Sequence, residues 1–504
     1  MIRAKTKKFY VRNTDTGEFE PIILASGPEA AAIEAWLDKH PEATTTVLDG
    51  SITTDKLHYA LKLRTIKDYV TPQMFGAKGD GVTDDTEAIQ RMFDFAVASC
   101  YKFVGVYKTY SVQISNRDNI KIIGDGEIIG ANAVFRFENC NDLLISGMRG
   151  TRLSIEISES DNAQVIGNTL TGKDSGYDGI KLLNCTNYSV CSNIVSGFGV
   201  DGIKVSNTDD AAMTTKSKNG IIADNFIYGN ADGGIDLYAG GKNVIVSGNF
   251  IIGNKAGLTL KYTGTNVANE LYAKDVLVKG NFIAECNVLT SVDMSNVYFT
   301  GNIFKNPVNH GLLVGSIEKE YTYDNITIDG NAFVHESENT VSAVTVDKMK
   351  SITFANNKVD GFYRGITTSA DKNMITSNDF NDVATPIQFN PENAEDNSMI
   401  VFGCSFSGVT NKCLNILGDT IIENIVLAFN NWDGSGAVYD VYNTSFLYQQ
   451  EKNSWNKTYG ETSERPTVAE YSVPLQMFFD TTLGKPIWRN KDNNAWIDAT
   501  GSTV

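Results

Sequence analysis

The chain has 504 residues, of which 42% are hydrophobic and 20% are charged, so it can bury a large core and is not intrinsically disordered. Its 60 Asp and Glu residues outnumber its 43 Lys and Arg residues, which gives a net charge of −17. An acidic surface without a polybasic cluster repels phosphate, so we expect no nucleic acid and no membrane partner. No apolar run reaches the about 18 residues of a membrane span, and the N-terminus lacks the apolar region of a signal peptide.

The seven cysteines are an odd number and contain no CxxC pair. This usage is typical of buried free thiols and predicts folding in a reducing cytoplasm. The sequence contains no zinc-ligand set, phosphate-binding loop or dinucleotide fingerprint, so no cofactor is expected. A calcium ion held by an acidic turn stays open as an alternative.

Residues 1–70 differ in composition from the rest of the chain. They begin with a basic stretch, continue with an alanine-rich segment at 28–40 that predicts a short helix, and contain the phrase GSITTDKL. This phrase is similar to segments that precede the shafts of phage tail fibres. We therefore expect an N-terminal segment for virion attachment, to phage tail or baseplate proteins, or for oligomerisation. The alternative is a folded cap without a partner.

Residues 71–104 predict an amphipathic capping helix. Asp84 is followed three residues later by Glu87, which is the spacing of a capping box. The next positions place apolar residues on one helical face. We expect a helix over residues 84–99 that covers an open end of the following domain. The apolar face consists of Ile89, Met92, Phe93, Ala96 and Val97.

A repeat then organises most of the chain. A small residue, an asparagine, any residue and an apolar residue recur about every 26 residues. Short β-branched runs such as NVIVSGN lie between these sites and alternate like strands. The pattern predicts an all-β fold, a right-handed parallel β-helix of about 13 coils over residues 105–447. The repeat sites are Asn168, Asn193, Asn225, Asn249, Asn281, Asn302, Asn331, Asn357, Asn378, Cys404 and Asn430.

We interpret the recurring asparagines as a structural ladder. In a parallel β-helix each coil places its side chains directly above those of the preceding coil. An asparagine at a turn tolerates left-handed backbone, and its amide can bond along the stack. We therefore expect a stabilising role for these residues and not a catalytic one.

The segment FGAKGDGVTDDTEAIQ, Phe75 to Gln90, resembles the opening motif of proteins of the pectate lyase superfamily, especially phage tailspikes and tail appendages. The resemblance implies a right-handed β-helix that is commonly trimeric and often acts on polysaccharide. Because the motif is specific for the fold and not for catalysis, none of its aspartates is taken as a site residue.

Five strands that follow a glycine can be aligned: LSIEIS, DGIKLL, DGIKVS, GGIDLY and AGLTLK. Their apolar positions predict two inward columns, and the alternation of strands directs the residues between them outward. The result is an exposed face that carries charges of both signs. The first inward column is Ile155, Ile180, Ile203, Ile235 and Leu258, and the second is Ile157, Leu182, Val205, Leu237 and Leu260. The outward residues are Glu156, Lys181, Lys204, Asp236 and Thr259, with Ser158, Leu183, Ser206, Tyr238 and Lys261 two places later.

This face is the predicted site. Two coils are long, with extra segments at 207–220 and 263–275, and such insertions form loops on one face of a solenoid. We expect them to wall a groove around Asp236 and Tyr238. Carboxylates stacked on adjacent coils raise one another's pKa, which divides them into acid and base. The further carboxylates that enter this face are Asp178, Asp201 and Asp232.

We assign Asp201 and Asp236 as the acid and base, and Tyr238 as a stacking platform or proton donor. Lys204 and Lys261 are expected to hold an anionic sugar, with Lys181 and Glu156 as further contacts. A lyase would use these cations to neutralise a substrate carboxylate. The structural alternatives are that Asp-Gly only makes the turn and that the charges form a solvated ladder of ion pairs.

The strings YDGIK and VDGIKV, which contain Asp178 and Asp201, are similar to the NTDGID strand of polygalacturonase-type hydrolases. The match is partial, because no Asn-Thr precedes the aspartate and a lysine replaces the last acid. A Gly-His-Gly motif is also absent. The chain is therefore not assigned a polygalacturonase site on this ground.

Residues 448–504 leave the repeat and predict a small β module, similar to those at the ends of phage tail and host-contact proteins. Trp488 and Trp496 flank a turn-forming stretch and are candidates for stacking on sugar rings; the alternative is packing in a small core or a trimer seam.

The chain as a whole predicts a homotrimeric phage tail appendage. We expect it to bind and cleave a bacterial surface polysaccharide, as part of the virion, after synthesis in the host cytoplasm. The alternatives are a receptor-binding or structural tail protein without enzymatic activity and a free carbohydrate enzyme. Exposed apolar residues such as Leu183 favour association, because threefold symmetry buries all three copies at once.

Overall fold

The structure is a computed structural model that forms two compact units, Met1–Tyr69 and Val70–Val504. In the first unit β1 (Phe9–Arg12) and β2 (Phe19–Ile22) form an antiparallel pair. The helix expected at 28–40 lies outside the described residues. These are 9–12, 19–22, 69–95, 99–207, 217–238, 241–261, 274–315, 323–337, 339–347, 349–390, 398–417, 424–428, 430–433, 437–441, 447–451, 459–460, 462–464, 477–490 and 495–504.

The second unit begins with a short cap. It contains the 3-10 helix η1 (Pro72–Phe75), β3 (Asp80–Asp84) and the helix α4 (Thr86–Asp94). The buried face of α4 includes the predicted Ile89, Met92 and Phe93. The Phe93 ring packs against a cluster of aromatic residues of the first coils, Tyr101, Phe103, Phe135 and Phe137. The predicted amphipathic helix is confirmed, although its expected end near residue 99 is wrong, because the backbone leaves the helix after Asp94.

The predicted capping box is wrong. The residue that precedes α4 is Asp85, and its carboxylate does not cap the helix. It accepts hydrogen bonds from the backbone N–H groups of Lys78 and Gly79 instead, at 2.8 and 3.0 Å. Asp84 bonds the backbone and hydroxyl of Thr86. The acidic residues of the motif therefore stabilise the turn before the helix.

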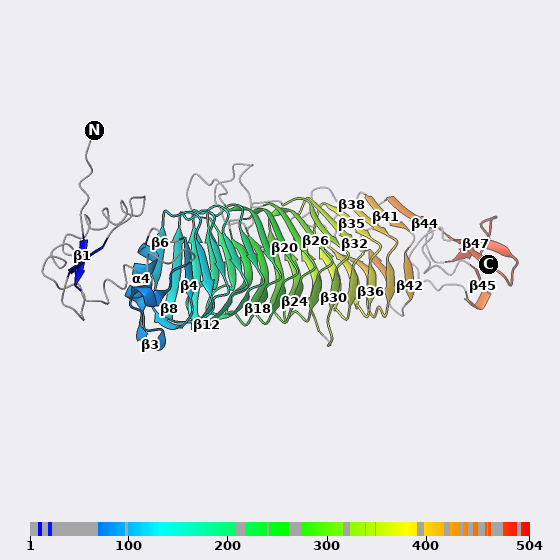
Figure 1. Cartoon of the computed structure of the whole chain (residues 1–504). Coiled ribbons are helices and arrows are strands. Elements are labelled where there is room, and N and C mark those ends of the chain that lie inside the picture. The colour runs from blue at the N-terminus through cyan, green and yellow to red at the C-terminus, as the bar shows by residue number, and fades with distance from the viewer. Residues whose placement is uncertain are drawn as a thin grey trace, which may run out of the picture. The chain divides into compact units, whose positions relative to one another are not determined.

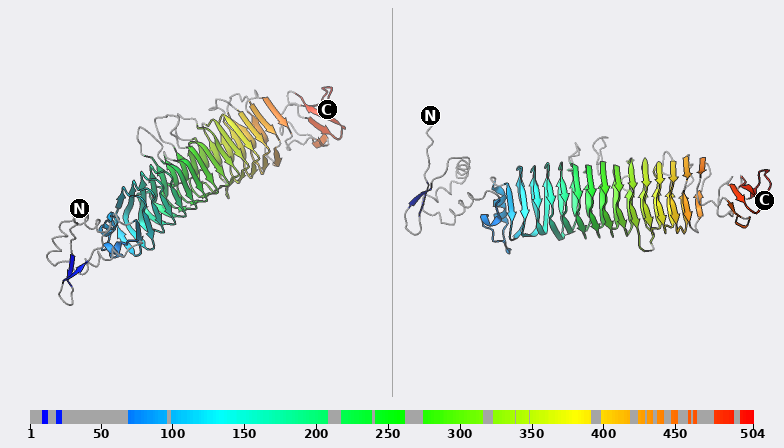
Figure 2. Two further views of the ribbon diagram at one scale, coloured as in Figure 1. Left: turned by 45° about the horizontal axis from the view of Figure 1, so that its top comes forward. Right: turned by 45° about the vertical axis from the view of Figure 1, so that its right-hand side comes forward.

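A parallel β-helix follows, and its strands stack coil upon coil in Figures 1 and 2. Sheet 1 has 15 parallel strands, of which 13 lie wholly within the predicted range 105–447. Its strands are β4 (Cys100–Phe103), β7 (Lys121–Gly124), β9 (Leu144–Ser146), β11 (Gln164–Ile166), β14 (Ser189–Cys191), β17 (Lys218–Ala223), β20 (Lys242–Ser247), β23 (Lys274–Lys279), β26 (Ser295–Thr300), β29 (Ile326–Asp329), β32 (Ser351–Ala355), β35 (Lys372–Thr376), β38 (Ser398–Phe402), β41 (Asn424–Ala428) and β44 (Leu447–Glu451).

Two further stacks of parallel strands complete each coil, and they share the long strands β8 (Glu127–Glu138) and β10 (Arg149–Ser158). Sheet 2 continues from β5 (Val106–Thr109) through β12 (Thr169–Ser175), β15 (Ile194–Phe198), β18 (Phe226–Tyr228), β21 (Phe250–Ile252), β24 (Phe282–Ala284), β27 (Ile303–Lys305), β30 (Ala332–Val334), β33 (Lys358–Asp360), β36 (Asp379–Asn381), β39 (Ser405–Ser407) and β42 (Asn431–Asp433). Sheet 3 continues from β6 (Val112–Ser115) through β13 (Ile180–Leu183), β16 (Ile203–Ser206), β19 (Gly233–Tyr238), β22 (Ala256–Lys261), β25 (Val288–Asp293), β28 (His310–Val314), β31 (Ser342–Val346), β34 (Arg364–Thr368), β37 (Thr385–Phe389), β40 (Lys412–Ile416) and β43 (Ala437–Val441).

The register of sheet 3 confirms the predicted inward columns. Ile180 pairs with Ile203, and Ile203 pairs with Ile235, each in the same column of the next coil. All ten residues of the two columns are almost fully buried. The shared alternation on these five coils therefore produces a continuous apolar core along this part of the stack.

The asparagine ladder is also confirmed. The side chain of Asn193, for example, donates to Asn225 Oδ1 at 3.0 Å and to the carbonyl of Val165 at 2.9 Å. Equivalent side-chain bonds connect successive asparagines from Asn168 to Asn378. The expectation that these residues adopt left-handed backbone is wrong, because it is the residue before each one, such as Gly167, that has positive φ. The bend therefore comes first, and the asparagine points inward after it.

At the C-terminal end β45 (Tyr459–Gly460), β46 (Met477–Asp480), β47 (Lys485–Arg489) and β48 (Trp496–Ile497) form a four-stranded sheet, and η3 (Thr462–Glu464) is a short 3-10 helix. Phe478, Ile487 and Trp496 form its core. The expectation that Trp496 stacks on a sugar is therefore wrong, because its ring packs against Phe478. Trp488 points to the other side of β47 and is half-buried, so its sugar contact stays a prediction.

Candidate functional site

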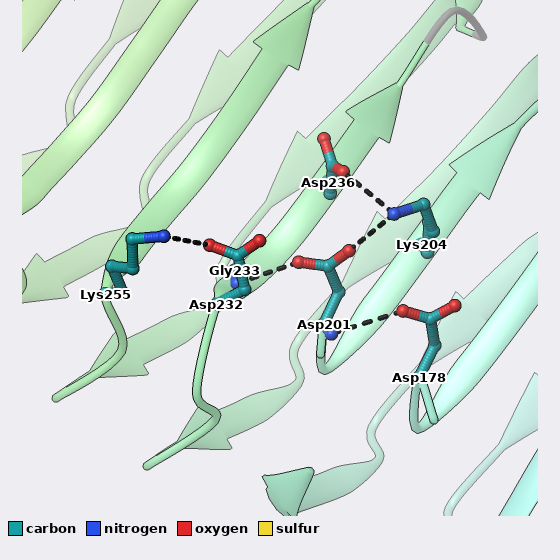
Figure 3. A network of polar contacts seen from close by, with 7 residues as sticks. All are labelled: Asp178, Asp201, Lys204, Asp232, Gly233, Asp236 and Lys255. Carbon is teal, nitrogen blue, oxygen red and sulfur yellow. Dashed lines mark hydrogen bonds and ion pairs between the residues drawn. The ribbon is translucent and has the colours of Figure 1, made fainter. Parts of the chain in front are cut away.

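Strands β16 and β19 of sheet 3 bring the main candidate residues together. Lys204 and Asp236 are direct neighbours in the register, on adjacent coils. Asp201 lies in the turn just before β16, and Asp178 occupies the same place one coil earlier. Figure 3 shows Lys204 between the carboxylates of Asp201 and Asp236. The structure thus unites four of the predicted residues in one polar cluster, the carboxylate cluster Asp178, Asp201, Lys204 and Asp236.

Lys204 is the centre of this cluster. Its ammonium group lies 2.8 Å from Asp201 Oδ2 and 3.4 Å from Asp236 Oδ2. Burial by itself would lower the pKa of Lys204, but the hydrogen bond to Asp201 and the charges of Asp236 and Asp201 raise it above its usual value. Lys204 is therefore a permanent cation that two carboxylates already bind. Its expected role as an anchor for an anionic sugar stays a prediction, and a substrate would have to share this ammonium group with Asp201 and Asp236.

Asp236 was expected on an exposed face. The structure corrects this, because its side chain is only 7% exposed. Its Oδ1 atom is buried and has no hydrogen-bond partner among the described residues. Burial, together with the negative charge of Asp201, raises the pKa of Asp236 to about 7, although Lys204 opposes the shift. A carboxyl group with such a pKa is suited to give or take a proton near neutral pH.

Asp201 is tied into the backbone of the next coil. Its Oδ1 accepts a hydrogen bond of 2.7 Å from the N–H of Gly233, while its own N–H donates to Asp178 Oδ1 at 3.2 Å. A Cβ atom at position 233 would lie 2.5 Å from Asp201 Oδ1, so any other residue there would displace the Asp201 carboxylate. Burial raises the pKa of Asp178, and the charge of Lys204 opposes this effect. Asp178 and Asp201 therefore each bind a backbone N–H of the next coil and also belong to the carboxylate cluster.

Other predicted residues lie outside the carboxylate cluster. Asp232 points away and pairs with Lys255 at 3.2 Å, with both side chains exposed (Figure 3). Glu156 lies 3.8 Å from Arg136, and Lys181 has no ion pair among the described residues. Because Asp232 is paired at the surface, the expectation that it belongs with the other carboxylates of the site is wrong. Glu156 and Lys181 stay predictions as substrate contacts.

Tyr238 and Lys261 border the cluster. The Lys204 ammonium lies 5.3 Å from the centroid of the Tyr238 ring, which is a cation–π distance. Tyr238 is 36% exposed and pairs with Lys261 on the next coil. An aromatic ring with one accessible face beside carboxylates suits the stacking of a sugar. Most of the two expected loops, residues 208–216 and 262–273, lies outside the described residues, so the walls of the groove stay a prediction.

The sequence pattern alone does not single out Asp293. It pairs with Lys261 in the register and is 2% exposed, and so it extends the outward column one coil beyond the predicted face. Aligning VLTSVD below AGLTLK would have found it, but Thr290 occupies an inward position of that strand and interrupts the apolar column. Polar residues inside the core thus conceal the continuation of the pattern.

In the described part of the chain, no group of three His, Cys, Asp or Glu side chains is placed to hold a metal ion. No described helix is long and apolar enough to cross a membrane. All seven cysteines are free thiols, and five of them are buried.

The fold and this geometry define a class of protein. The family model described as "Right handed beta helix region" matches residues 103–283 and 153–333, and the register of all three sheets agrees with it. The chain has the right-handed parallel β-helix fold. The N-terminal fragment of the bacteriophage phi29 gene product 12 is similar in structure, with a TM-score of 0.50, 12% identity and coverage of 79% of this chain and 95% of that chain.

Curated relatives match part of the sequence. A capsule K30/K69-specific depolymerase of Klebsiella phage K64-1 is 30% identical over 156 residues, which are 27% of this chain and 20% of the relative. The exo-poly-alpha-D-galacturonosidase of Dickeya chrysanthemi is 23% identical over 121 residues, 24% of this chain and 20% of that protein. The chain thus spans about a fifth of the length of each, and the predicted resemblance to phage tailspikes is confirmed as a resemblance.

Proposed function

We propose that the protein is a phage tailspike that binds and depolymerises a bacterial surface polysaccharide at the carboxylate cluster. The observation that carries the proposal is Asp236, a buried carboxyl group with a pKa raised to about 7 beside a second carboxylate. Active sites are where such perturbed groups concentrate. The partial matches to a phage capsule depolymerase and to a galacturonosidase support polysaccharide as the substrate.

The cluster suits glycoside hydrolysis. At neutral pH Asp236 holds a proton for part of the time and can donate it to a glycosidic oxygen, while Asp201 supplies negative charge at the anomeric carbon. Both Oδ2 atoms contact the Lys204 nitrogen, at 2.8 and 3.4 Å, so they lie at most about 6 Å apart. Two carboxyl groups this close can act together on one glycosidic bond. Tyr238 is placed to support the sugar ring.

A second function is favoured by the burial of Asp201, which is only 2% exposed and holds the N–H of Gly233. A carboxylate in that position stabilises the junction of two coils. In this case the cluster is structural, and the protein holds host glycan on the same face without cleaving it.

The test is incubation of the protein with a panel of purified bacterial capsular and wall polysaccharides. New reducing ends report cleavage, and ultraviolet absorbance of an unsaturated product separates a lyase from a hydrolase. We expect Asp236→Asn and Asp201→Asn to lower the cleavage rate at least ~100-fold, the usual effect of losing a general acid or base. Asp232→Asn is the matched control, because it removes an exposed carboxylate of the same coil that is paired with Lys255. Normal cleavage by both site variants would place the chemistry elsewhere, and binding without cleavage would support the second function.

Attachment to the virion through residues 1–70 and a homotrimeric state are part of the proposal. Two rows of exposed apolar residues support association. On sheet 2, Phe226 and Phe250 stand in the same outward column, and on sheet 1, Ile221 and Ile245 do the same. Each of these side chains is about two-fifths exposed. Rows of this kind commonly mark protein interfaces.

A further inference from the structure

The register of sheet 3 places a second polar group on the two columns that carry the carboxylate cluster. One column runs from Asp201 and Gly233 to Arg364, and the other from Lys204 and Asp236 to Gln388. From Gly233 and from Lys204 onward, every step along these columns is a register pair of adjacent strands. Asp201 precedes β16 and joins its column through the hydrogen bond that its Oδ1 accepts from the Gly233 N–H. Six coils separate Asp201 from Arg364, and six separate Asp236 from Gln388. At the ~4.8 Å spacing of parallel strands this is roughly 29 Å.

Three contacts hold the Arg364 side chain in place. Its guanidinium group lies over the Tyr363 ring, 4.8 Å from the centroid. Its Nε donates to Gln388 Oε1 at 3.2 Å, and Asn415 Nδ2 approaches the same oxygen at 3.5 Å from the following coil. The planar guanidinium is therefore fixed on a ring and by one nitrogen. Among the described residues, no hydrogen bond reaches its terminal nitrogens, which can therefore take a further partner.

Arg364 makes no ion pair with a carboxylate among the residues that the structure describes, although the chain has an excess of acidic groups. It is half-buried, as are Tyr363 and Gln388. Thr367 pairs with Gln388 in the other column, and its hydroxyl is buried with no hydrogen-bond partner within the described residues. A preorganised guanidinium fork suits a carboxylate, which it binds through two parallel hydrogen bonds.

We propose that Tyr363, Arg364 and Gln388 form a distal glycan site that binds a carboxylate-bearing sugar of a long polysaccharide. This inference rests on the proposed function and deepens it, since the chain of sugars would run along sheet 3 from the carboxylate cluster to Arg364. Tyr363 presents an aromatic edge beside the sugar, while the amide of Gln388 is suited to its hydroxyl groups. At this distal end of the face, Arg364 is the cation that would recognise a carboxylate of the substrate.

The experiment measures binding with the cleavage-deficient Asp236→Asn protein as background. The probes are polygalacturonate, alginate, hyaluronan and xanthan, each in native and carboxyl-reduced form, with Kd determined by biolayer interferometry. We expect at least one native polymer to bind at least tenfold more tightly than its reduced form. Arg364→Gln should remove this difference. Lys358→Gln is the matched control, because it removes one positive charge from the same coil on sheet 2, where Lys358 pairs with Asp360.

Length gives a second readout. Oligosaccharides that are too short to span about 29 Å, six strand spacings, bind at only one of the two places. For fragments held at the carboxylate cluster, the Arg364→Gln variant should therefore match the background protein. The inference is overturned if no native polymer binds more tightly than its reduced form, or if Arg364→Gln changes Kd less than twofold. If the unmodified protein cleaves a polysaccharide but its binding does not depend on Arg364, this inference alone is overturned. If it neither cleaves nor binds any member of the capsule panel, the proposed function is overturned.

Discussion

Two opposing effects set the ionisation of Asp236. Burial and the neighbouring charge of Asp201 favour the neutral carboxyl group, whereas Lys204 favours the carboxylate. The first two effects prevail, and the pKa rises to about 7. The same residue therefore costs folding free energy whenever the pH is high enough to ionise it.

This balance predicts a pH-dependent effect of Asp236→Asn on stability. In the unfolded chain, Asp236 has the ordinary Asp pKa of 3.8. Between about pH 4 and 7, folding is therefore accompanied by uptake of a proton at Asp236. The stability of the folded protein falls as the pH rises through this range. The asparagine variant lacks this loss. We expect the variant and the unmodified protein to have equal melting temperatures near pH 4. Above pH 7 the free energy of unfolding of the variant should be higher, by up to about 4 kcal/mol.

Thermal unfolding followed by circular dichroism across this pH range measures the effect. Asp232→Asn serves as the control, because an exposed carboxylate paired with Lys255 should change stability little at any pH. A variant that is equally stable or less stable at pH 8 would show that Asp236 is ionised at no cost in the folded protein.

Alternation along the strands predicts which side of the sheet each of these residues occupies, and the structure agrees. It does not predict what covers that side. Asp236 is buried although it points outward, because its carboxylate turns toward Lys204 and Asp201. Arg364 could not be predicted as a site residue for another reason. Its strand, RGITT, lacks the second large apolar residue by which the first five strands were aligned.

At the scale of the element, the asparagine ladder is the connection between coils. Asn281 donates to Asn302 Oδ1 and to the carbonyl of Val246, both at 2.9 Å, and its own Oδ1 accepts from Asn249. All of these groups are buried. Because a lost partner leaves a buried donor unsatisfied, each rung stabilises two neighbours at once.

We expect Asn281→Ala to destabilise the protein by about 3 kcal/mol, since it removes several buried hydrogen bonds and leaves donors of Asn249 without an acceptor. Cys404 occupies the same column, where its sulfur receives only a long contact of 3.8 Å from Asn378. Cys404→Asn should therefore restore the ladder and add about 1 kcal/mol. Chemical denaturation of both variants measures the free energy of unfolding. If Asn281→Ala leaves this free energy unchanged, the ladder does not stabilise the protein.

The repeat made the β-helix predictable because the same pattern is imposed on every coil. The cap was harder to predict, since it occurs once. The sequence marked Asp84 as the start of a helix, but the carboxylates there bond nearby loop N–H groups with equal ease. Likewise, the spacing of the asparagines could not show whether Asn168 or the preceding Gly167 carries the left-handed backbone.

At the scale of the whole molecule, the exposed apolar rows bear on assembly. The Phe250 and Phe282 rings stack with centroids 4.6 Å apart, so the row is a continuous apolar ridge and not a set of single exposed residues. We expect Phe250→Asp to convert the proposed trimer into folded monomers, because it places a charge in a desolvated seam. Light scattering measures the mass.

The control for this change is Val308→Asp, which charges an apolar residue that is 60% exposed and lies outside both rows. It should leave the mass at three times that of one chain. A single-chain mass for the unmodified protein would contradict the trimer, and a trimer in Phe250→Asp would remove the sheet 2 row from the interface. Circular dichroism verifies that each variant keeps its β structure.

The ladder bonds span as few as 21 and as many as 32 residues of sequence, yet their geometry is the same in each coil. A coil therefore interacts with the rest of the molecule only through its upper and lower neighbours, and its turns are free to vary in length. This makes the coil a natural unit of genetic exchange. A recombination event that begins and ends at ladder asparagines would transplant whole coils, with the side chains they carry, into another β-helix of this kind without a break in the ladder.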